Sequence, residues 1–104
     1  MARRIVRTAR ADEDLIAIWL WIARDDPAAA DRMLYAIDAR CAQLAERPLS
    51  GPARDDILPG LRHLVAGPYL VLYRVAPEVV RVLRVLHGRQ RIDRTDIASA
   101  PDEL

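Results

Sequence analysis

The sequence predicts an α+β domain: an N-terminal strand, an antiparallel helical hairpin, and then a three-stranded antiparallel meander. An apolar pattern of helical period between Thr8 and Arg47 predicts the hairpin. Three β-rich segments, separated by Gly67-Pro68 and Ala76-Pro77-Glu78, predict the meander, because both separators are turn signals at hairpin spacing. With helices and strands segregated along the chain, we expect one sheet with the helices on one face.

The first strand is expected from Arg4 to Thr8, where Thr8 can cap a helix. Apolar residues then recur at helical spacing and should pack on the sheet: Leu15, Ile18, Trp19 and Ile22. At about 100° per residue, Ile16 and Leu20 lie to one side of that stripe and Trp21 to the other. The first helix therefore has more apolar surface than one sheet requires.

Asp26 and Pro27 favour a new helix start, because aspartate is a good N-cap and proline a good first helical residue. Apolar residues continue at helical spacing in this second helix: Ala30, Met33, Leu34, Ile37, Cys41 and Leu44. The pattern stops at Arg47-Pro48, and a loop with three prolines and two glycines, residues 48–60, leads into the meander.

The meander is expected to form strands over residues 61–66, 69–75 and 79–87. From Leu61 to Arg94 it carries a charge of +5, seven arginines against Glu78 and Asp93. In a regular strand Arg81 and Arg84 point to opposite faces, so at least one should reach the face away from the helices. We expect that face to be uncovered, and an arginine on the helical side to need an acidic partner or a path to solvent.

The chain totals fit a single domain over residues 1–104, with a polar tail from 92 to 104. All sixteen basic residues are arginine, and the net charge is only +1. The single cysteine, Cys41, excludes an internal disulfide, and the Ile5-Val6 run is too short for a signal peptide. With no apolar run near the roughly 18 residues of a membrane span, we expect a cytoplasmic protein with no membrane contact. No metal-ligand cluster or cofactor motif is present, so none is predicted.

Several residues are of the types that a ribonuclease needs as base, acid and cation: Glu46, Arg54, Arg62, His63, Arg84 and His87. Each also has a structural interpretation. His63 can be an ordinary strand residue, Arg54 can pair with Asp55 or Asp56, and His87 can hold a turn. An RNA platform would also place aromatic rings beside the basic side chains. Tyr69 and Tyr73 fall on the opposite face of their strand from Arg74.

The order and spacing of several segments resemble the ParE branch of the ParE/RelE superfamily of type II toxin–antitoxin toxins. These segments are Pro48-Leu49-Ser50-Gly51-Pro52-Ala53-Arg54, Gly60-Leu61-Arg62, Tyr69, Tyr73-Arg74 and Arg84-Val85-Leu86-His87-Gly88-Arg89. The resemblance runs from about Arg4 to Arg91. It implies a bacterial toxin that inhibits DNA gyrase by binding and is neutralised, in a hetero-oligomer, by a ParD-like antitoxin.

The resemblance also implies two sets of site residues. Antitoxin binding is expected at Ile16, Leu20, Trp21, Tyr35 and Arg74, and target binding at Arg54, Arg62, Arg84, His87 and Arg89. The alternative is a RelE-like ribonuclease that cuts messenger RNA, with Arg62, Arg84 and His87 as catalytic residues. The absence of lysine, and of an aromatic residue after the last strand, departs from the ribonuclease pattern. A third hypothesis is a non-toxic partner of an antitoxin, and direct nucleic-acid binding stays open.

Overall fold

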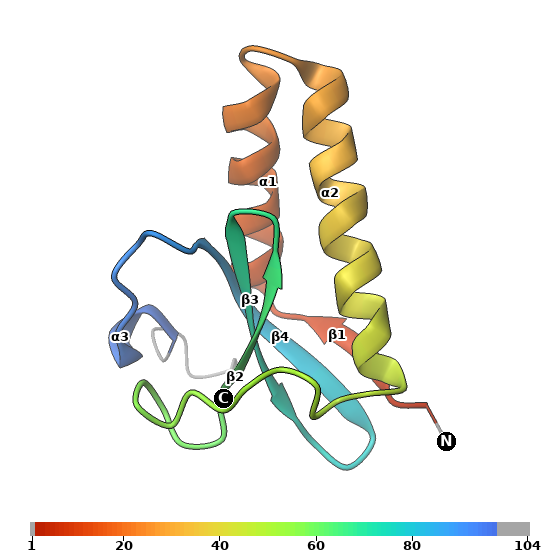
Figure 1. Ribbon diagram of the computed structural model, residues 1–104, viewed down its shortest axis with the longest axis vertical. Helices are drawn as coiled ribbons and strands as arrows, with labels where there is room; N and C mark the ends of the chain where they lie inside the picture. The colour runs from red at the N-terminus through yellow and green to blue at the C-terminus, as the bar shows by residue number, and fades with distance from the viewer. Residues whose placement is uncertain (1, 98–104) are drawn as a thin grey trace.

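The computed structural model describes residues 2–97, and it has the predicted order of elements (Figure 1). Strand β1 (Arg4–Arg7) precedes helices α1 (Ala9–Ala23) and α2 (Pro27–Ala42), and α2 runs into the short 3-10 helix η1 (Gln43–Ala45). Strands β2 (Arg62–Ala66), β3 (Tyr69–Val75) and β4 (Val79–His87) follow, and then the single turn α3 (Arg94–Ile97). The predicted α+β class is confirmed. Residues 98–104 of the predicted polar tail lie outside the described part of the chain.

Within residues 2–97 the strands form one sheet in the order β1-β4-β3-β2. The meander is antiparallel as predicted, whereas β1 joins its far edge parallel to β4, with Val6 facing Arg81. The sequence alone did not place β1. Its parallel direction is compatible with the long connection through the helices and the meander, because parallel strands need such a crossover.

Both helices begin at the residues that the sequence predicts. Thr8 accepts a hydrogen bond from the Ala11 backbone N–H, and Asp26 accepts one from Ala29, with Pro27 in the first helical turn. These caps satisfy backbone donors that have no partner inside the helix. Figure 1 shows that the resulting hairpin projects well past the turn between β2 and β3. Its outer half therefore stands clear of the sheet.

The main core lies between the hairpin and one face of the sheet. Leu15 and Ile18 of α1 and Ile37 of α2 pack there against the valines of β3 and β4. Tyr73 is completely buried, donates a hydrogen bond to the Pro48 carbonyl oxygen and accepts one from the Gly51 N–H. One side chain thus fixes the loop that follows η1 to the middle of the sheet.

The prediction that the other face of the sheet is uncovered is wrong. A second apolar cluster occupies part of it and draws on β3, β4, the loop before β2 and the end of the chain: Leu58, Leu61, Leu72, Leu83, Leu86 and Ile97. Ile57 and Ile92 pack against its edge, and Ile97 is fully buried. Residues 92–97 are therefore a cover for the sheet and not a purely polar tail.

Strand β4 is not regular. Tyr73 faces Val82 while Leu72 faces Arg84, so Leu83 has no facing residue on β3. This irregularity interrupts the two-residue alternation: Val80, Val82 and Val85 belong to the main core, whereas Leu83 and Leu86 belong to the second cluster. The predicted alternation between Arg81 and Arg84 thus does not apply, because it required a regular strand.

No helix within residues 2–97 combines the length and the apolar character needed to cross a membrane.

Candidate functional site

A groove runs along the helical hairpin and continues to the free edge of β1. It consists of two adjoining cavities of about 540 and 450 Å³ that share Arg7, Asp12 and Asp38. The first lies between the helices and is also lined by Leu15, Ile16, Trp19 and Leu34. The second is also lined by Ile5, Val6, Cys41 and Ala42. We call this continuous depression the hairpin groove.

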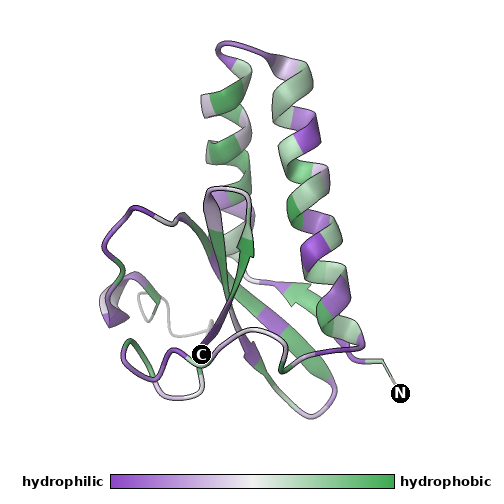
Figure 2. Cartoon of the chain, in the orientation of Figure 1, coloured by the Kyte–Doolittle hydropathy of each residue, from purple (hydrophilic) through white to green (hydrophobic). Residues whose placement is uncertain are grey.

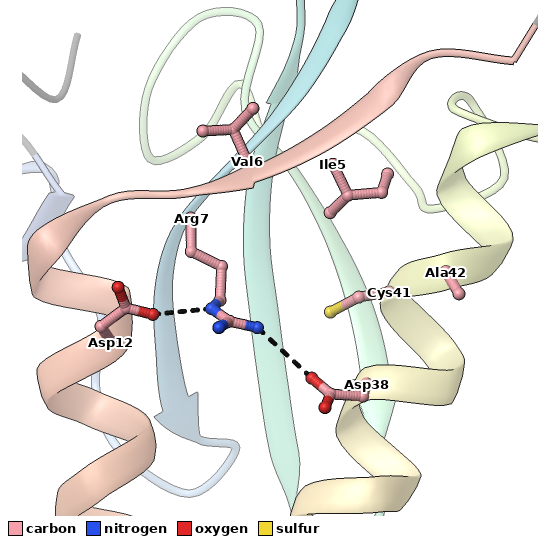
Figure 3. A pocket seen from close by; sticks show the side chains of 7 residues that line it. All are labelled: Ile5, Val6, Arg7, Asp12, Asp38, Cys41 and Ala42. Atoms are coloured by element: carbon pink, nitrogen blue, oxygen red, sulfur yellow. Dashed lines mark hydrogen bonds and ion pairs between the residues drawn. The ribbon is translucent and has the colours of Figure 1, made fainter.

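The Arg7 side chain lies at the centre of the hairpin groove, between Asp12 and Asp38 (Figure 3). Its Nε donates to Asp12 Oδ1 at 2.6 Å, and its Nη1 lies 3.5 Å from Asp38 Oδ1. The hydrogen bond to Asp12 raises the pKa of Arg7 above its already high ordinary value, so the guanidinium stays charged. Because all three side chains are about half exposed, the bridge positions charge in the groove more than it stabilises the fold.

Cys41 lies in the wall of the same groove, on α2 (Figure 3). Burial, aided by the negative charge of Asp38, raises the pKa of its thiol to about 11. The sulfur is therefore a protonated, weakly nucleophilic wall atom at neutral pH. Cys41 is therefore unsuited to act as a catalytic nucleophile at neutral pH.

Large apolar side chains are exposed along the outer part of the hairpin, as predicted. Ile16 is 60% exposed, Leu20 57% and Tyr35 74%. Figure 2 shows strongly hydrophobic bands on α1 above the β2–β3 turn. Trp19 on α1 donates from its indole nitrogen to Asp31 on α2 at 2.8 Å and so links the two helices. The hairpin groove thus has exposed apolar side chains along its outer border and charged side chains at its centre.

Trp21, which is 66% exposed, lies on the other flank of α1 and lines a separate cavity of about 310 Å³. This cavity, the end groove, is lined by Asp14, Ala17, Ile18, Trp21, Tyr69, Val85, Leu86, His87 and Gln90. Arg24 lies over the Trp21 ring at 5.2 Å, and the His87 and Tyr69 rings meet edge to face at 5.5 Å. Since His87 Nδ1 accepts a hydrogen bond from the Arg89 N–H, neutral His87 carries its proton on Nε2.

The residues predicted for ribonuclease catalysis have separate partners. Arg62 donates to the carbonyl oxygens of Gly51 at 2.7 Å and Leu49 at 3.4 Å. Arg84 is 8% exposed and forms a two-pronged ion pair with Asp14, at 2.7 and 2.9 Å. Arg62 faces Tyr73 and His87 faces Tyr69, which places them roughly 13 Å apart along the sheet.

Arg54, predicted for target binding, is held in the loop before β2. It forms a two-pronged hydrogen-bonded ion pair with Asp56 and also lies 3.2 Å from His63 Nδ1. Burial lowers the pKa of His63, and the nearby Arg54 lowers it further, so the ring is neutral at neutral pH. Arg74, predicted for antitoxin binding, lies on the face away from the helices and donates to the Pro59 carbonyl oxygen. Neither arginine borders the hairpin groove.

Comparison with known proteins gives the family. A family model described as the ParE toxin of the type II toxin–antitoxin system parDE matches residues 5–92. The chain belongs to the ParE toxin family. It is thus a toxin of the ParE/RelE superfamily from a type II toxin–antitoxin system.

Relatives within the superfamily carry both branch names. Toxin ParE3 of Caulobacter vibrioides is 32% identical over 86% of this chain and 90% of its own length. Toxin RelE2 of the same organism is 36% identical over 82% of this chain and 94% of its own. The structure of a chromosomal ParDE system from P. aeruginosa matches with a TM-score of 0.71 at 24% identity, over 83% of this chain and 96% of that one. This last match concerns the fold alone.

For this member of the ParE family, sequence reasoning missed the charged middle of the hairpin groove. Arg7, Asp12 and Asp38 come from β1, α1 and α2, and only the packing of these elements brings them together. No spacing in the sequence signals the cluster. Sequence reasoning also assigned Trp21 and Ile16 to the same antitoxin-binding set, whereas Ile16 lines the hairpin groove and Trp21 the end groove. A helical wheel gave that separation but not the grooves.

Proposed function

We propose that this ParE-family toxin inhibits DNA gyrase by binding to it and has no ribonuclease activity of its own. The observation that carries the proposal is the dispersal of the candidate catalytic residues: Arg62 holds a loop, Arg84 holds Asp14, and His87 closes a turn with Arg89. RNA cleavage needs a base, an acid and a cation around one phosphate. These three side chains do not surround a common point.

Arg54 in the loop before β2 and His63 at the start of β2 also have structural partners. His63 lies against Arg54, which is in turn engaged by Asp56. A general base should titrate near the working pH, whereas the pKa of His63 is lowered by burial and by Arg54. We therefore assign Arg54, Arg62 and Arg84 to holding the fold. The exposed rim of the end groove is left as the target-binding surface, with Trp21, His87 and Arg89.

The hairpin groove is proposed as the binding site of the antitoxin. An amphipathic helix of a ParD-like protein would lay its apolar face over Ile16 and the neighbouring Leu20 and Tyr35. The three side chains are more than half exposed, and such exposed apolar surface is typical of a binding site. Charged residues of the antitoxin would meet Arg7, Asp12 and Asp38 in the middle of the groove.

Purified toxin tests the gyrase proposal directly. We expect it to block the supercoiling of relaxed plasmid by gyrase and to accumulate cleaved DNA, while free messenger and ribosome-bound messenger stay uncut. His87→Gln tests the ribonuclease alternative: any messenger cleavage that uses this base is lost in the variant. Codon-specific cleavage of messenger without any effect on gyrase would refute the proposal. Growth that is unaffected by overexpression of the toxin alone would favour a non-toxic binding partner instead.

Two serine variants separate the proposed surfaces. Ile16→Ser should weaken binding to the ParD-like protein from the same operon by about 2 kcal/mol, roughly 30-fold, and leave gyrase inhibition intact. Trp21→Ser should weaken gyrase inhibition and leave antitoxin binding intact. Leu49→Ser is the matched control, because Leu49 is 63% exposed but borders neither groove. If Ile16→Ser and Leu49→Ser bind the antitoxin equally well, the hairpin groove is not its site.

A further inference from the structure

Three arginines form a row across the face of the sheet that points away from the helices. Val80 and Val82 of β4 and Tyr73 and Val75 of β3 pack in the main core, so Arg81 and Arg74 between them lie on the opposite face. Ile5 likewise packs on the main core and leaves Arg4 on that opposite face. We call Arg4, Arg74 and Arg81 the arginine row.

The register brings these charges close together. Arg81 directly faces Arg74 on β3, and on its other side it faces Val6, two residues after Arg4. Directly facing side chains in a sheet have their Cβ atoms about 5 Å apart, and like charges in that position destabilise the pair. The sequence nevertheless places the guanidinium groups of Arg74 and Arg81 opposite each other. The third arginine, Arg4 on β1, lies diagonally opposite Arg81.

The row has little compensation from the described part of the chain. None of the ion pairs within residues 2–97 includes Arg4, Arg74 or Arg81. Arg74 donates to the Pro59 carbonyl oxygen, whereas the half-buried Arg81 side chain has no hydrogen bond or ion pair with any residue in that range. A partly desolvated cation normally has an anionic or carbonyl partner. The charge and burial of the row therefore favour an anionic partner on this face.

We propose that the arginine row binds carboxylate side chains from an extended acidic segment of a partner protein. Guanidinium groups bind carboxylates through two parallel hydrogen bonds, and the spacing across neighbouring strands, about 4.8 Å, suits one carboxylate between two of them. If the proposed function holds, the partner is the antitoxin, which then reaches a face of the toxin that the hairpin groove does not include.

The surroundings of the row favour a peptide over a nucleic acid. Tyr69 and Tyr73 both pack in the main core, so within residues 2–97 these strands present no aromatic ring beside the arginines for base stacking. The neighbouring side chains on this face are instead apolar: Val6 faces Arg81 and Val79 faces Arg4, and both valines are only half-buried. An extended segment that alternates acidic and apolar residues matches this pattern.

The test uses a blocked synthetic peptide that alternates glutamate with alanine, titrated into the full toxin and followed by NMR or calorimetry. Arg81→Met removes the charge but keeps much of the apolar stem, and it should weaken peptide binding about tenfold or more. Arg81→Lys keeps a positive charge but not the two-pronged hydrogen-bonding geometry. Its affinity for the peptide should lie between that of the wild type and that of Arg81→Met. Arg32→Gln is the matched control, because Arg32 is 70% exposed at the far end of the hairpin.

Stability distinguishes binding from a structural role. Because Arg81→Met relieves the repulsion from Arg74, its melting temperature should be equal to that of the wild type or about 1–5 °C higher. A lower melting temperature, or unchanged peptide binding, would overturn the proposal. A single-stranded oligonucleotide that binds more tightly than the peptide, with the same dependence on Arg81, would also overturn it. These measurements involve neither gyrase nor the antitoxin, so they stand or fall separately from the proposed function.

Discussion

The ion pair between Arg84 and Asp14 is expected to be the most sensitive polar contact of the fold. Asp14 on α1 accepts three hydrogen bonds, from Arg84 Nε at 2.7 Å, Arg84 Nη2 at 2.9 Å and the Val85 backbone N–H at 2.9 Å. The two side chains are only 10% and 13% exposed. Their contact fastens the first helix to the irregular part of β4.

Asp14→Asn removes the negative charge that faces the buried guanidinium, whereas the hydrogen bond from Arg84 to the Asp96 carbonyl oxygen stays. Breaking one side of a buried pair costs about 3–5 kcal/mol, and we expect the lower end here because asparagine keeps one acceptor oxygen. For a domain of this size, about 3 kcal/mol corresponds to roughly 12–24 °C in melting temperature. Thermal and urea unfolding of the purified variant measure both quantities.

The matched control is Asp12→Asn on the same helix. Asp12 pairs with Arg7 at 2.6 Å, but both side chains are about half exposed, so its loss should cost less than about 1 kcal/mol. The double variant Asp14→Leu/Arg84→Met, which removes both charges, should recover more than half of the stability lost in Asp14→Asn. If Asp14→Asn costs no more than Asp12→Asn, burial of the Arg84 pair does not stabilise the fold.

Four further predictions concern the loop before β2 and the groove wall. Tyr73→Phe should cost about 1–3 kcal/mol in urea unfolding, because it leaves the Gly51 N–H and the Pro48 carbonyl without their buried partner; a change below about 0.5 kcal/mol would contradict this. Gly51→Ala should cost at least as much, since an added Cβ would lie 2.1 Å from the His63 carbonyl oxygen; a variant of wild-type stability would show that the loop can shift freely. The pKa of His63 is lowered from 6.5 by burial and Arg54, so the unfolded chain binds more protons there and the associated stability is full above about pH 6.5 and is lost as pH falls through the folded pKa. Between pH 7.5 and 5, the wild type should therefore lose more stability than His63→Asn, and equal slopes would argue against a buried neutral ring. Alkylation of Cys41 in the native protein should rise with pH as for a thiol with a pKa of about 11, and a fast reaction at neutral pH would mean that its wall opens.

The helices and the meander could be predicted because their signals are local. Thr8 and Asp26-Pro27 mark helix starts within a few residues, and Gly67-Pro68 marks a turn between two β-rich runs. The exposure of Ile16, Leu20 and Trp21 also followed from helical period alone. Each of these features depends on neighbours in the sequence.

The second cluster could not be predicted, because its members have no shared period. Ile57, Leu58 and Leu61 lie in a loop rich in proline and glycine, and Ile97 lies in a polar stretch. Each residue in isolation is an ordinary exposed apolar side chain. Only the sheet, which presents Leu72 and Leu83 on the same face, gives them a common surface.

The candidate site was predicted in part for the same reason. Residue types were identified correctly, but Arg84 could be assigned to Asp14 only when α1 and β4 were seen in contact, across 70 positions of sequence. The irregularity at Leu83 had the same effect, because it invalidated an alternation that holds elsewhere in the meander. Side chains whose partners lie far along the chain need the tertiary structure for their assignment.

The parallel contact between β1 and β4 has a consequence for folding during synthesis. Arg4 faces Val79, so the first strand cannot join the sheet until 75 further residues have been made. At about 5–20 residues per second, this delay is roughly 4–15 s. Contacts of such long range also slow folding after synthesis. Throughout this interval the hairpin can form from local contacts while β1 has no strand to pair with, so a partner that recognises the hairpin would have time to bind before the toxin is complete.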